Sequence, residues 1–337
     1  MRQIGNNVRQ FTKVPFKKNR RAIICPICGN KHRYHCSVTM DESLVVCKYS
    51  YSDKQASDGR YIHILNVNNI KPIYKVFIPK PESKPMKADA EMCHAVYTAL
   101  LSNLELTPAH GYALLEERGL SDTTVTYNLY ASVPNEAKGN ELARTLAESF
   151  NLKGVPGFYK EDGGWRFVTT VKGFYVPYRD ERGRIVGLQI RRNGNPKDKY
   201  LWLTSTDKVE GASPGSPLHF VKPEIARQTG AVIITEGALK ADRIGDFTDE
   251  AVVALAGVSV VPPDKLLAAL REAFPKLQKA IIAFDMDWKE KPEVKEALMR
   301  LLRRLKDEGL NTNVRTWNIS LGKGLDDALY RAGGVAA

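Results

Sequence analysis

The sequence predicts a multidomain α/β protein with a small β module near its N-terminus. Residues 231–236 (AVIITE) and 280–285 (AIIAFD) are apolar, mostly β-branched runs that end in carboxylates. Such runs are typical of buried parallel strands, whose carboxyl ends form the ligand-binding edge of an open sheet. The cysteines before residue 48 are spaced as in small metal-binding modules. We therefore expect an open α/β sheet in the C-terminal third of the chain.

The positive charge of the chain is concentrated near its N-terminus. At 337 residues the chain is long enough for two or three domains, and its net charge is +12. Residues 1–88 hold 17 Lys and Arg against 5 Asp and Glu, a difference that equals the whole excess of +12. Such a concentration is typical of proteins that bind a phosphate backbone, although a basic tail can also serve solubility alone.

The sequence predicts neither a membrane span nor a secretory leader. The chain has no run of about 18 apolar residues. Its first 21 residues are basic and polar, without the apolar core of a signal peptide. We therefore expect a cytoplasmic protein without a membrane partner. Five cysteines in such a protein favour metal binding over disulfides.

Four cysteines predict a structural zinc site. Cys25 and Cys28 form a Cys-x-x-Cys knuckle, and Cys36 and Cys47 follow it, with Cys47 at the end of a predicted strand, residues 43–47. Four thiolates can surround Zn²⁺ tetrahedrally. A β module shorter than about 70 residues needs a cross-link of this kind to fold. His35 is close enough in sequence to replace Cys36 as a ligand. Four cysteines without a metal are the plainer alternative.

This module spans residues 23–70, and the sequence predicts an arm before it and a linker after it. Residues 1–22 carry seven Lys and Arg and are expected to form a flexible basic arm. Residues 71–88 contain four prolines and five lysines, a composition that favours a semi-rigid linker. The module is therefore expected to be tethered to the rest of the chain.

Residues 89–225 are predicted to form a mixed α+β domain. The first half has the apolar spacing of helices, with Pro108 at one helix start and Ser121 as the cap of another. In the second half, apolar and polar residues alternate as they do in strands, and the pattern includes a hairpin. The main predicted strands cover residues 165–168, 173–178 and 184–191.

Positive side chains follow the last of these strands. Arg191 and Arg192 end it, and Lys199 lies in the loop beyond, next to Tyr200. Clustered cations beside a tyrosine suit nucleotide phosphates or a template strand. A solvated hairpin tip is the alternative.

Residues 226–337 alternate strands with helices, the last predicted strand covering residues 313–317, and carry three carboxylates at two strand ends. Glu236 is followed by a glycine and a helical pattern, and Asp285 and Asp287 stand two apart. In an extended strand end, the two aspartates would point to one side. Three carboxylates from two strand ends can hold Mg²⁺ or Mn²⁺ for phosphate chemistry. An isolated Asp-x-Asp is often only a solvated turn, but its pairing with an earlier Glu-Gly favours a metal site.

Residues 322–329 (GKGLDDAL) carry further charged groups near the C-terminus. They would place Lys323, Asp326 and Asp327 at the rim of the predicted metal site. The alternative is that the aspartates simply occupy the first turn of a last helix.

In order and type, these motifs resemble those of DnaG-like bacterial and phage DNA primases. The resemblance is strongest to zinc-finger-plus-TOPRIM proteins of phages and mobile elements, the DUF3854 type, and it covers nearly the whole chain. Residues 117–121 (ERGLS) resemble the segment that opens the primase core, and residues 174–191 resemble its basic hairpin. Residues 199–201 (KYL) resemble a stretch that faces the nucleotide. Glu236-Gly and the Asp-x-Asp that ends at Asp287 match the TOPRIM acids.

The resemblance implies a zinc-ribbon-like module, a primase basal subdomain and a TOPRIM domain with a Rossmann-like α/β fold. It implies metal-dependent synthesis of RNA primers from ribonucleoside triphosphates on single-stranded DNA, together with a replicative helicase or polymerase as partner. Glu236, Asp285 and Asp287 would be both the catalytic residues and the ligands of Mg²⁺ or Mn²⁺. The residues expected to bind nucleotide or DNA are Arg191, Arg192, Lys199, Lys240 and Lys323.

Two departures from the primase pattern keep other functions open. Lys240 stands where housekeeping primases have an acid, and Trp288 replaces a glycine that often follows the Asp-x-Asp. The lysine leaves the number of metal ions open and favours a non-catalytic accessory protein that binds single-stranded DNA. A TOPRIM nuclease is a third possibility, although it has no need of the predicted nucleotide-binding hairpin. The chain lacks a P-loop motif for a helicase motor and is short for a topoisomerase.

Overall fold

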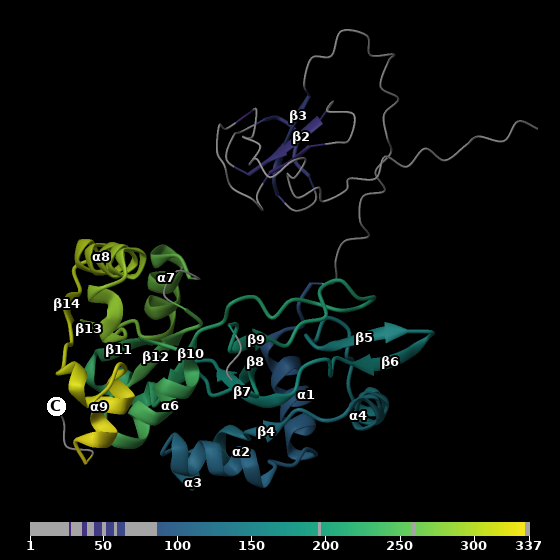
Figure 1. The fold of residues 1–337 in the computed structure, drawn as a ribbon, viewed down its shortest axis with the longest axis horizontal. Coiled ribbons are helices and arrows are strands. Elements are labelled where there is room, and N and C mark those ends of the chain that lie inside the picture. Colours follow the sequence, from purple (N-terminus) through teal and green to yellow (C-terminus); the bar gives the residue numbers. More distant parts are fainter. Residues whose placement is uncertain are drawn as a thin grey trace, which may run out of the picture. The chain divides into compact units, whose positions relative to one another are not determined.

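The computed structural model divides the chain into two compact units, Met1–Pro79 and Lys80–Ala337. Figure 1 colours the described residues along the sequence. The described residues are 27, 36–38, 44–48, 52–56, 59–64, 86–194, 197–257 and 261–333. The predicted basic arm, residues 1–22, lies outside them, as does almost all of the predicted linker.

The first unit contains a small antiparallel sheet in which β2 pairs with β1 on one side and β3 on the other. Its strands are β1 (Ser37–Val38), β2 (Leu44–Cys47) and β3 (Tyr61–Ile64). Val45 and Cys47, two apart on β2, pack with Cys36 in a small core, against which Ile27 lies. The strand predicted to end at Cys47 is therefore confirmed, and this cysteine faces the core.

Helices form the start of the second unit. Ser121 caps α3 by accepting a hydrogen bond from the amide of Thr124, as its position in the sequence predicts. Gly119, just before this cap, has a φ of 65°, which glycine adopts without a Cβ clash. The helices are α1 (Ala90–Ser102), α2 (Pro108–Tyr112), the π-helical η1 (Ala113–Glu117), α3 (Asp122–Asn128) and α4 (Glu136–Ser149).

A four-stranded antiparallel sheet with the order β4-β7-β8-β9 packs on α1, and its β7–β8 hairpin confirms the prediction. Tyr97 of α1 and Leu188 of β8 share one buried core. At Gly173 a Cβ would lie 2.0 Å from the carbonyl oxygen of Arg191, so the close approach of the strands requires glycine. The strands are β4 (Ala131–Ser132), β7 (Gly173–Arg179), β8 (Ile185–Arg192) and β9 (Tyr200–Trp202), beside a separate hairpin of β5 (Phe158–Glu161) and β6 (Gly164–Phe167).

The C-terminal third forms a five-stranded sheet with the order β10-β12-β11-β13-β14. The last four strands of the sequence are parallel, and β10 pairs antiparallel with β12. The sheet thus takes in a strand upstream of residue 226, where we placed the start of this domain. The strands are β10 (His219–Val221), β11 (Ala231–Glu236), β12 (Val252–Leu255), β13 (Lys279–Ile282) and β14 (Asn311–Val314).

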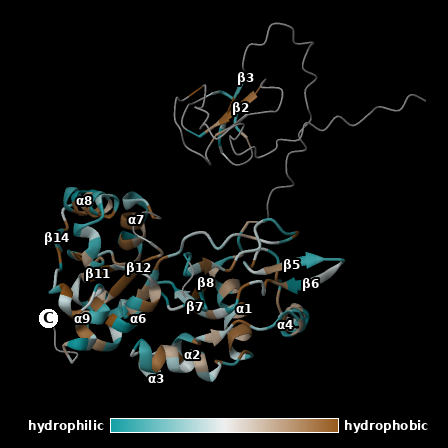
Figure 2. Ribbon diagram, viewed as in Figure 1, coloured by the Kyte–Doolittle hydropathy of each residue, from teal (hydrophilic) through white to brown (hydrophobic). Residues whose placement is uncertain are grey.

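Helices cover both faces of this sheet. Val232 and Ile234 of β11 belong to the core under α5, α7 and α8, whereas Ile233 faces α6 and α9. Figure 2 shows this sheet as predominantly hydrophobic. None of the described helices is both long and apolar enough to cross a bilayer. The helices are α5 (Pro223–Thr229), α6 (Ala238–Phe247), α7 (Pro263–Ala273), α8 (Pro292–Asp307) and α9 (Leu325–Arg331), with 3₁₀ helices η2 (Met286–Lys289) and η3 (Ile319–Leu321).

The last strand was predicted two residues too late. The pattern indicated residues 313–317, whereas β14 covers Asn311–Val314. Thr312 is buried in the sheet, and its hydroxyl donates to the carbonyl of Leu310. Trp317, the last residue of the predicted strand, lies beyond β14 and donates its indole N–H to the carbonyl of Gly322. It therefore closes the loop that leads towards α9.

A buried polar network fastens α6 to its neighbours. Asp242 of α6 accepts one hydrogen bond from the hydroxyl of Tyr130 and one from Nε2 of His219, at 2.9 Å. The Nδ1 atom of His219 accepts from the backbone amide of Arg179 at 2.9 Å, so Nε2 must carry the proton. All three side chains are buried. The network fixes the helix that follows the first carboxylate of the predicted site.

Replacing Tyr130 with phenylalanine is expected to lower the free energy of unfolding by about 1–3 kcal/mol, because one oxygen of the buried Asp242 carboxylate loses its partner. Urea unfolding followed by circular dichroism measures the change. Tyr112, which is 60% exposed, provides the matched control: Tyr112→Phe should stay within about 0.5 kcal/mol of the wild type. Equal stability of the two variants would contradict the structural role of the network.

Candidate active site

The predicted carboxylates meet at the carboxyl edge of the five-stranded sheet. Glu236 is the last residue of β11, and Gly237, with a φ of 83°, turns the chain into α6. The neighbouring parallel strand β13 ends at Ile282, and Asp285 and Asp287 follow it. Because carboxyl ends of parallel strands share one edge, the two segments deliver their acids to the same place. We refer to Glu236, Asp285 and Asp287 as the acidic edge.

The geometry of the two aspartates differs from the prediction. We expected them on an extended strand end, but Asp285 precedes the 3₁₀ helix η2 and Asp287 lies inside it. The chain turns here because the amide of Trp288 donates to the carbonyl of Asp285 at 3.0 Å. Both carboxylates nevertheless reach one cation: the Nζ atom of Lys323 lies 3.1 Å from Asp285 Oδ2 and 2.8 Å from Asp287 Oδ2.

Each carboxylate of the acidic edge faces a lysine. Lys240, on the first turn of α6, hydrogen-bonds to Asp285 Oδ1 and lies 3.9 Å from Glu236 Oε1. Lys291, four residues after Asp287, lies 2.6 Å from its Oδ2. The sequence analysis did not single out Lys291, although its i,i+4 spacing was a signal for this pair.

The surroundings shift the pKa values of these groups in different directions. Burial raises the pKa of Glu236 more than the nearby Lys240 lowers it. Burial also acts to raise the pKa of Asp287, but hydrogen bonds from Lys291 and Lys323 outweigh it, and the pKa is lowered. For Lys240 the Asp285 and Glu236 carboxylates outweigh burial, so its pKa is raised and it stays charged.

Asp326 adds a fourth carboxylate beside the acidic edge. It lies in the first turn of α9 and is 3% exposed, and its Oδ2 atom lies 3.3 Å from Arg243. Its buried Oδ1 atom has no hydrogen-bond partner. A Cβ on Gly324 would lie 2.2 Å from this Oδ1 and 3.4 Å from Asp285 Oδ1, so both oxygens border the space above the glycine. Asp327, 46% exposed on its side chain, pairs with Arg243 at 2.8 Å.

The residues fit a hard divalent cation by donor type. In the part of the chain that the structure describes, no three carboxylate, thiolate or imidazole groups converge as a ready-made metal site, and the lysines engage the acidic edge instead. The orphaned oxygen of Asp326 is costly to bury without a partner. A bound cation would supply that partner and replace a lysine contact.

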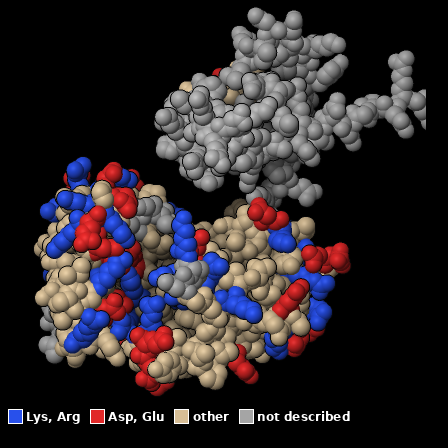
Figure 3. Space-filling model, viewed as in Figure 1, with Lys and Arg blue, Asp and Glu red and all other residues tan. Residues whose placement is uncertain are grey.

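The predicted basic residues lie at the far end of the β7–β8 hairpin. Arg191 and Arg192 end β8, and the Arg191 guanidinium lies 5.5 Å from the ring centroid of Tyr200. Lys199, exposed in the loop, accepts a backbone hydrogen bond from Arg192 at 2.9 Å. In the face drawn in Figure 3, Lys and Arg side chains gather near the boundary between the C-terminal sheet and the middle of the chain.

Packing links this hairpin to the acidic edge. Phe174, which pairs with Arg191 across β7 and β8, belongs to the same buried cluster as Ala238 and Leu239 of α6. These two residues open α6 and are separated from Glu236 only by Gly237. The end of the hairpin that carries the cations is thereby anchored against the helix that starts at the acidic edge.

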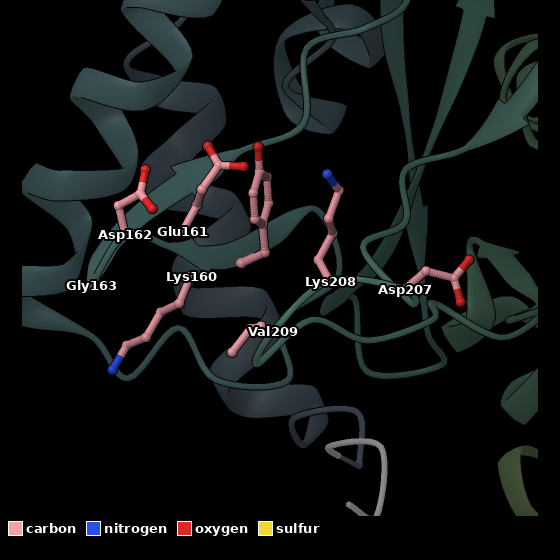
Figure 4. Close-up of a pocket in the computed structure, with 8 residues that line it drawn as sticks. Lys160, Glu161, Asp162, Gly163, Asp207, Lys208 and Val209 are labelled. Carbon is pink, nitrogen blue, oxygen red and sulfur yellow. The ribbon is translucent and has the colours of Figure 1, made fainter. Parts of the chain in front are cut away.

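Two surface cavities lie away from the acidic edge. One of about 520 Å³ opens between β5 and the loop at residues 207–209, and Figure 4 shows acidic and basic side chains around it. Its lysines already contact rings: Lys208 lies 4.9 Å from the ring of Tyr159, and Lys160 lies 5.4 Å from that of Trp165. Another cavity of about 490 Å³ is lined partly by Asp242, Gly245 and Asp246 of α6. These positions lie on the side of the helix opposite Lys240.

Two of the predicted zinc ligands come together in the first unit. The Sγ atoms of Cys36 and Cys47 are 3.7 Å apart, and both residues are buried. This separation is too long for a disulfide, but it matches two sulfurs that each lie about 2.3 Å from one tetrahedral Zn²⁺. The other predicted ligands, Cys25 and Cys28, and the alternative His35 lie outside the described residues.

The fold and the sequence can be compared with known proteins. Residues 223–336 match the family model described as "Domain of unknown function (DUF3854)". No curated protein matches the chain. The RNA polymerase domain of Mycobacterium tuberculosis primase DnaG superposes with a TM-score of 0.55 at 15% identity, covering 74% of this chain and 82% of that one. A DnaG primase catalytic domain bound to single-stranded DNA gives 0.51 at 20% identity, with 72% and 76% covered.

The described fold is that of a primase catalytic core. The zinc-binding and RNA polymerase domains of Aquifex aeolicus primase support this, with a TM-score of 0.54 at 18% identity over 74% of this chain. The match covers 60% of the Aquifex chain. The predicted mixed α/β fold of primase type is thereby confirmed.

Proposed function

We propose that this protein is a DNA primase that joins ribonucleotides into short primers on single-stranded DNA. One observation carries the proposal: in a fold of primase type, Glu236, Asp285 and Asp287 meet at the carboxyl edge of two adjacent parallel strands. The cationic end of the β7–β8 hairpin packs against the helix that starts there. An acidic edge beside cations suits a reaction that moves a charged phosphate.

In this proposal, the C-terminal sheet is a TOPRIM domain and the acidic edge performs the chemistry. Asp285 and Asp287 would hold Mg²⁺ or Mn²⁺, with Glu236 as a further ligand or as the base for the attacking 3′-hydroxyl. A divalent ion bound there lowers the pKa of that hydroxyl and offsets charge on the transferred phosphate. The raised pKa of Glu236 suits a group that takes up a proton.

The cations around the acidic edge would position the substrates. Arg191, Arg192 and Lys199 would contact the phosphates of the incoming triphosphate or the template strand. Tyr200 lies beside Arg191 and is 37% exposed, so its ring is available to a base. Lys240 and Lys323 already contact carboxylates and would meet the transferred phosphate at the edge itself.

The first unit would read the template. We propose a zinc-ribbon-like module held by Cys25, Cys28, Cys36 and Cys47, supported by the spacing of the two described sulfurs. Together with the basic arm, it would hold single-stranded DNA near the start of synthesis. Replication of a phage, plasmid or other mobile element, with a helicase or polymerase as partner, is the setting that the resemblance implies.

Primer synthesis on a panel of single-stranded DNA templates tests the function. With labelled ribonucleoside triphosphates and Mg²⁺ or Mn²⁺, we expect short RNA products whose start depends on template sequence. A template of the same composition without the preferred start sequence serves as control. Products independent of any template would contradict a primase.

A second function has one specific observation in its favour. Lys240 occupies a central position among the carboxylates, as expected if the site were silent and the chain were an accessory protein. Absence of products together with tight binding of single-stranded DNA would establish that reading. Cleavage of the template in the same assay would identify a nuclease instead.

A further inference from the structure

Lys240 is built into the acidic edge rather than lying at its rim. It lies in the first turn of α6, four residues after Glu236, and its side chain comes close to that carboxylate. Its Nζ atom binds Asp285 Oδ1 and lies 3.9 Å from Glu236, and the side chain is 26% exposed. The buried network around Asp242 fixes the helix two residues further on. The surrounding structure therefore fixes the position of the Lys240 side chain.

Lys323 is more exposed than Lys240, and it lies outside any helix or strand. Its side chain is 52% exposed and stands in the short segment between η3 and α9, outside any helix or strand. It contacts the Oδ2 atoms of Asp285 and Asp287, whereas Lys240 contacts Oδ1 of Asp285. One oxygen of Asp285 thus contacts a lysine whose position is fixed, and the other contacts an exposed lysine.

We propose that Lys240 takes the place of one divalent ion, so that the acidic edge binds a single Mg²⁺ or Mn²⁺. The ion would be held by Asp285 and Asp287, beside the unpartnered oxygen of Asp326, in place of Lys323. Lys240 would remain paired with Asp285. The inference rests on the proposed function only in assigning the ion to these acids.

Charge balance supports one ion rather than two. The acidic edge together with Asp326 and Asp327 carries five negative charges, whereas Lys240, Lys291 and Arg243 carry three positive ones. One divalent ion balances this set once Lys323 has left. Two divalent ions with Lys240 would leave an excess of two positive charges in a partly buried place, which is unfavourable without further anions. Asp326 does not supply that anion, because its charge and that of Asp327 are already counted in this balance with Arg243.

Manganese titration of the full-length zinc-loaded protein tests the number of ions. The paramagnetic resonance signal of free Mn²⁺ gives the number bound per chain, with the double variant Asp285→Asn, Asp287→Asn as the baseline for other sites. We expect one ion above baseline for the wild type and two for Lys240→Asp. Lys323→Met, the matched control, should still bind one ion, at least about tenfold more tightly, because a competing cation is gone.

Two ions in the wild type would overturn the inference, as would a single ion in Lys240→Asp. Circular dichroism checks that each variant is folded. If Lys240→Asp does not fold, Lys240→Gln takes its place in the titration. We expect Lys240→Gln to bind a second ion with lower affinity than the first. A single ion in this variant would again overturn the inference. A wild type that binds one Mn²⁺ but makes no primers would refute the proposed function alone. Primer synthesis with two bound ions would refute only the role of Lys240.

Discussion

Replacing Glu236 with glutamine is expected to lower primer synthesis at least about a thousandfold, while single-stranded DNA binding stays within about twofold. The amide keeps the shape of the side chain but removes the negative charge that would bind a metal ion or accept a proton. Loss of one such group at a metal-assisted phosphate site removes several kcal/mol of transition-state stabilisation. Incorporation of labelled ribonucleotides measures synthesis, and fluorescence anisotropy measures DNA binding.

Glu272→Gln is the matched control for this change, because Glu272 is exposed on α7 and has the same chemistry. It should leave both measurements unchanged. Thermal unfolding of both variants separates a lost function from a lost fold. Glu236→Gln with near-normal synthesis would contradict the assignment of this residue, whereas parallel losses of synthesis and DNA binding would indicate a structural role.

The position of the acidic edge could be predicted from the sequence because it follows from strand polarity. Glu236 ends an apolar run and Asp285 follows another, and carboxyl ends of neighbouring parallel strands meet at one edge. The hairpin that ends in Arg191 was predictable for a similar reason, since its alternation and its turn lie close together in sequence.

The local geometry of the site depended on contacts that the sequence does not show. The turn of η2 depends on backbone hydrogen bonds after Asp285, so the two-residue spacing of its aspartates did not predict their directions. The contact of Lys240 with Asp285 joins residues 45 positions apart. From the sequence, Asp326 could lie either at the rim of the metal site or in the first turn of a last helix. The structure places it in the first turn of α9, with a buried oxygen near Asp285.

Replacing Cys47 with serine is expected to remove the zinc of the first unit and to unfold its small sheet. Cys47 ends β2, is fully buried and lies 3.7 Å from the sulfur of Cys36, so it would be a ligand at the centre of the module. Structural Zn²⁺ contributes about 10–16 kcal/mol to the folding of such small modules, and serine is a poor ligand for it. Plasma mass spectrometry should find one zinc per wild-type chain and none in the variant.

Cys93→Ala is the matched control, because Cys93 is fully buried in α1 of the second unit. It should keep its zinc. If the first unit reads the template, Cys47→Ser should lower the initiation of new primers at least about tenfold, while extension of a supplied primer stays within about twofold. The acidic edge belongs to the second unit, which is compact by itself. We therefore expect it to stay folded in this variant. Equal losses of initiation and extension would contradict a separate template reader, and a zinc content unchanged by Cys47→Ser would refute the metal site itself.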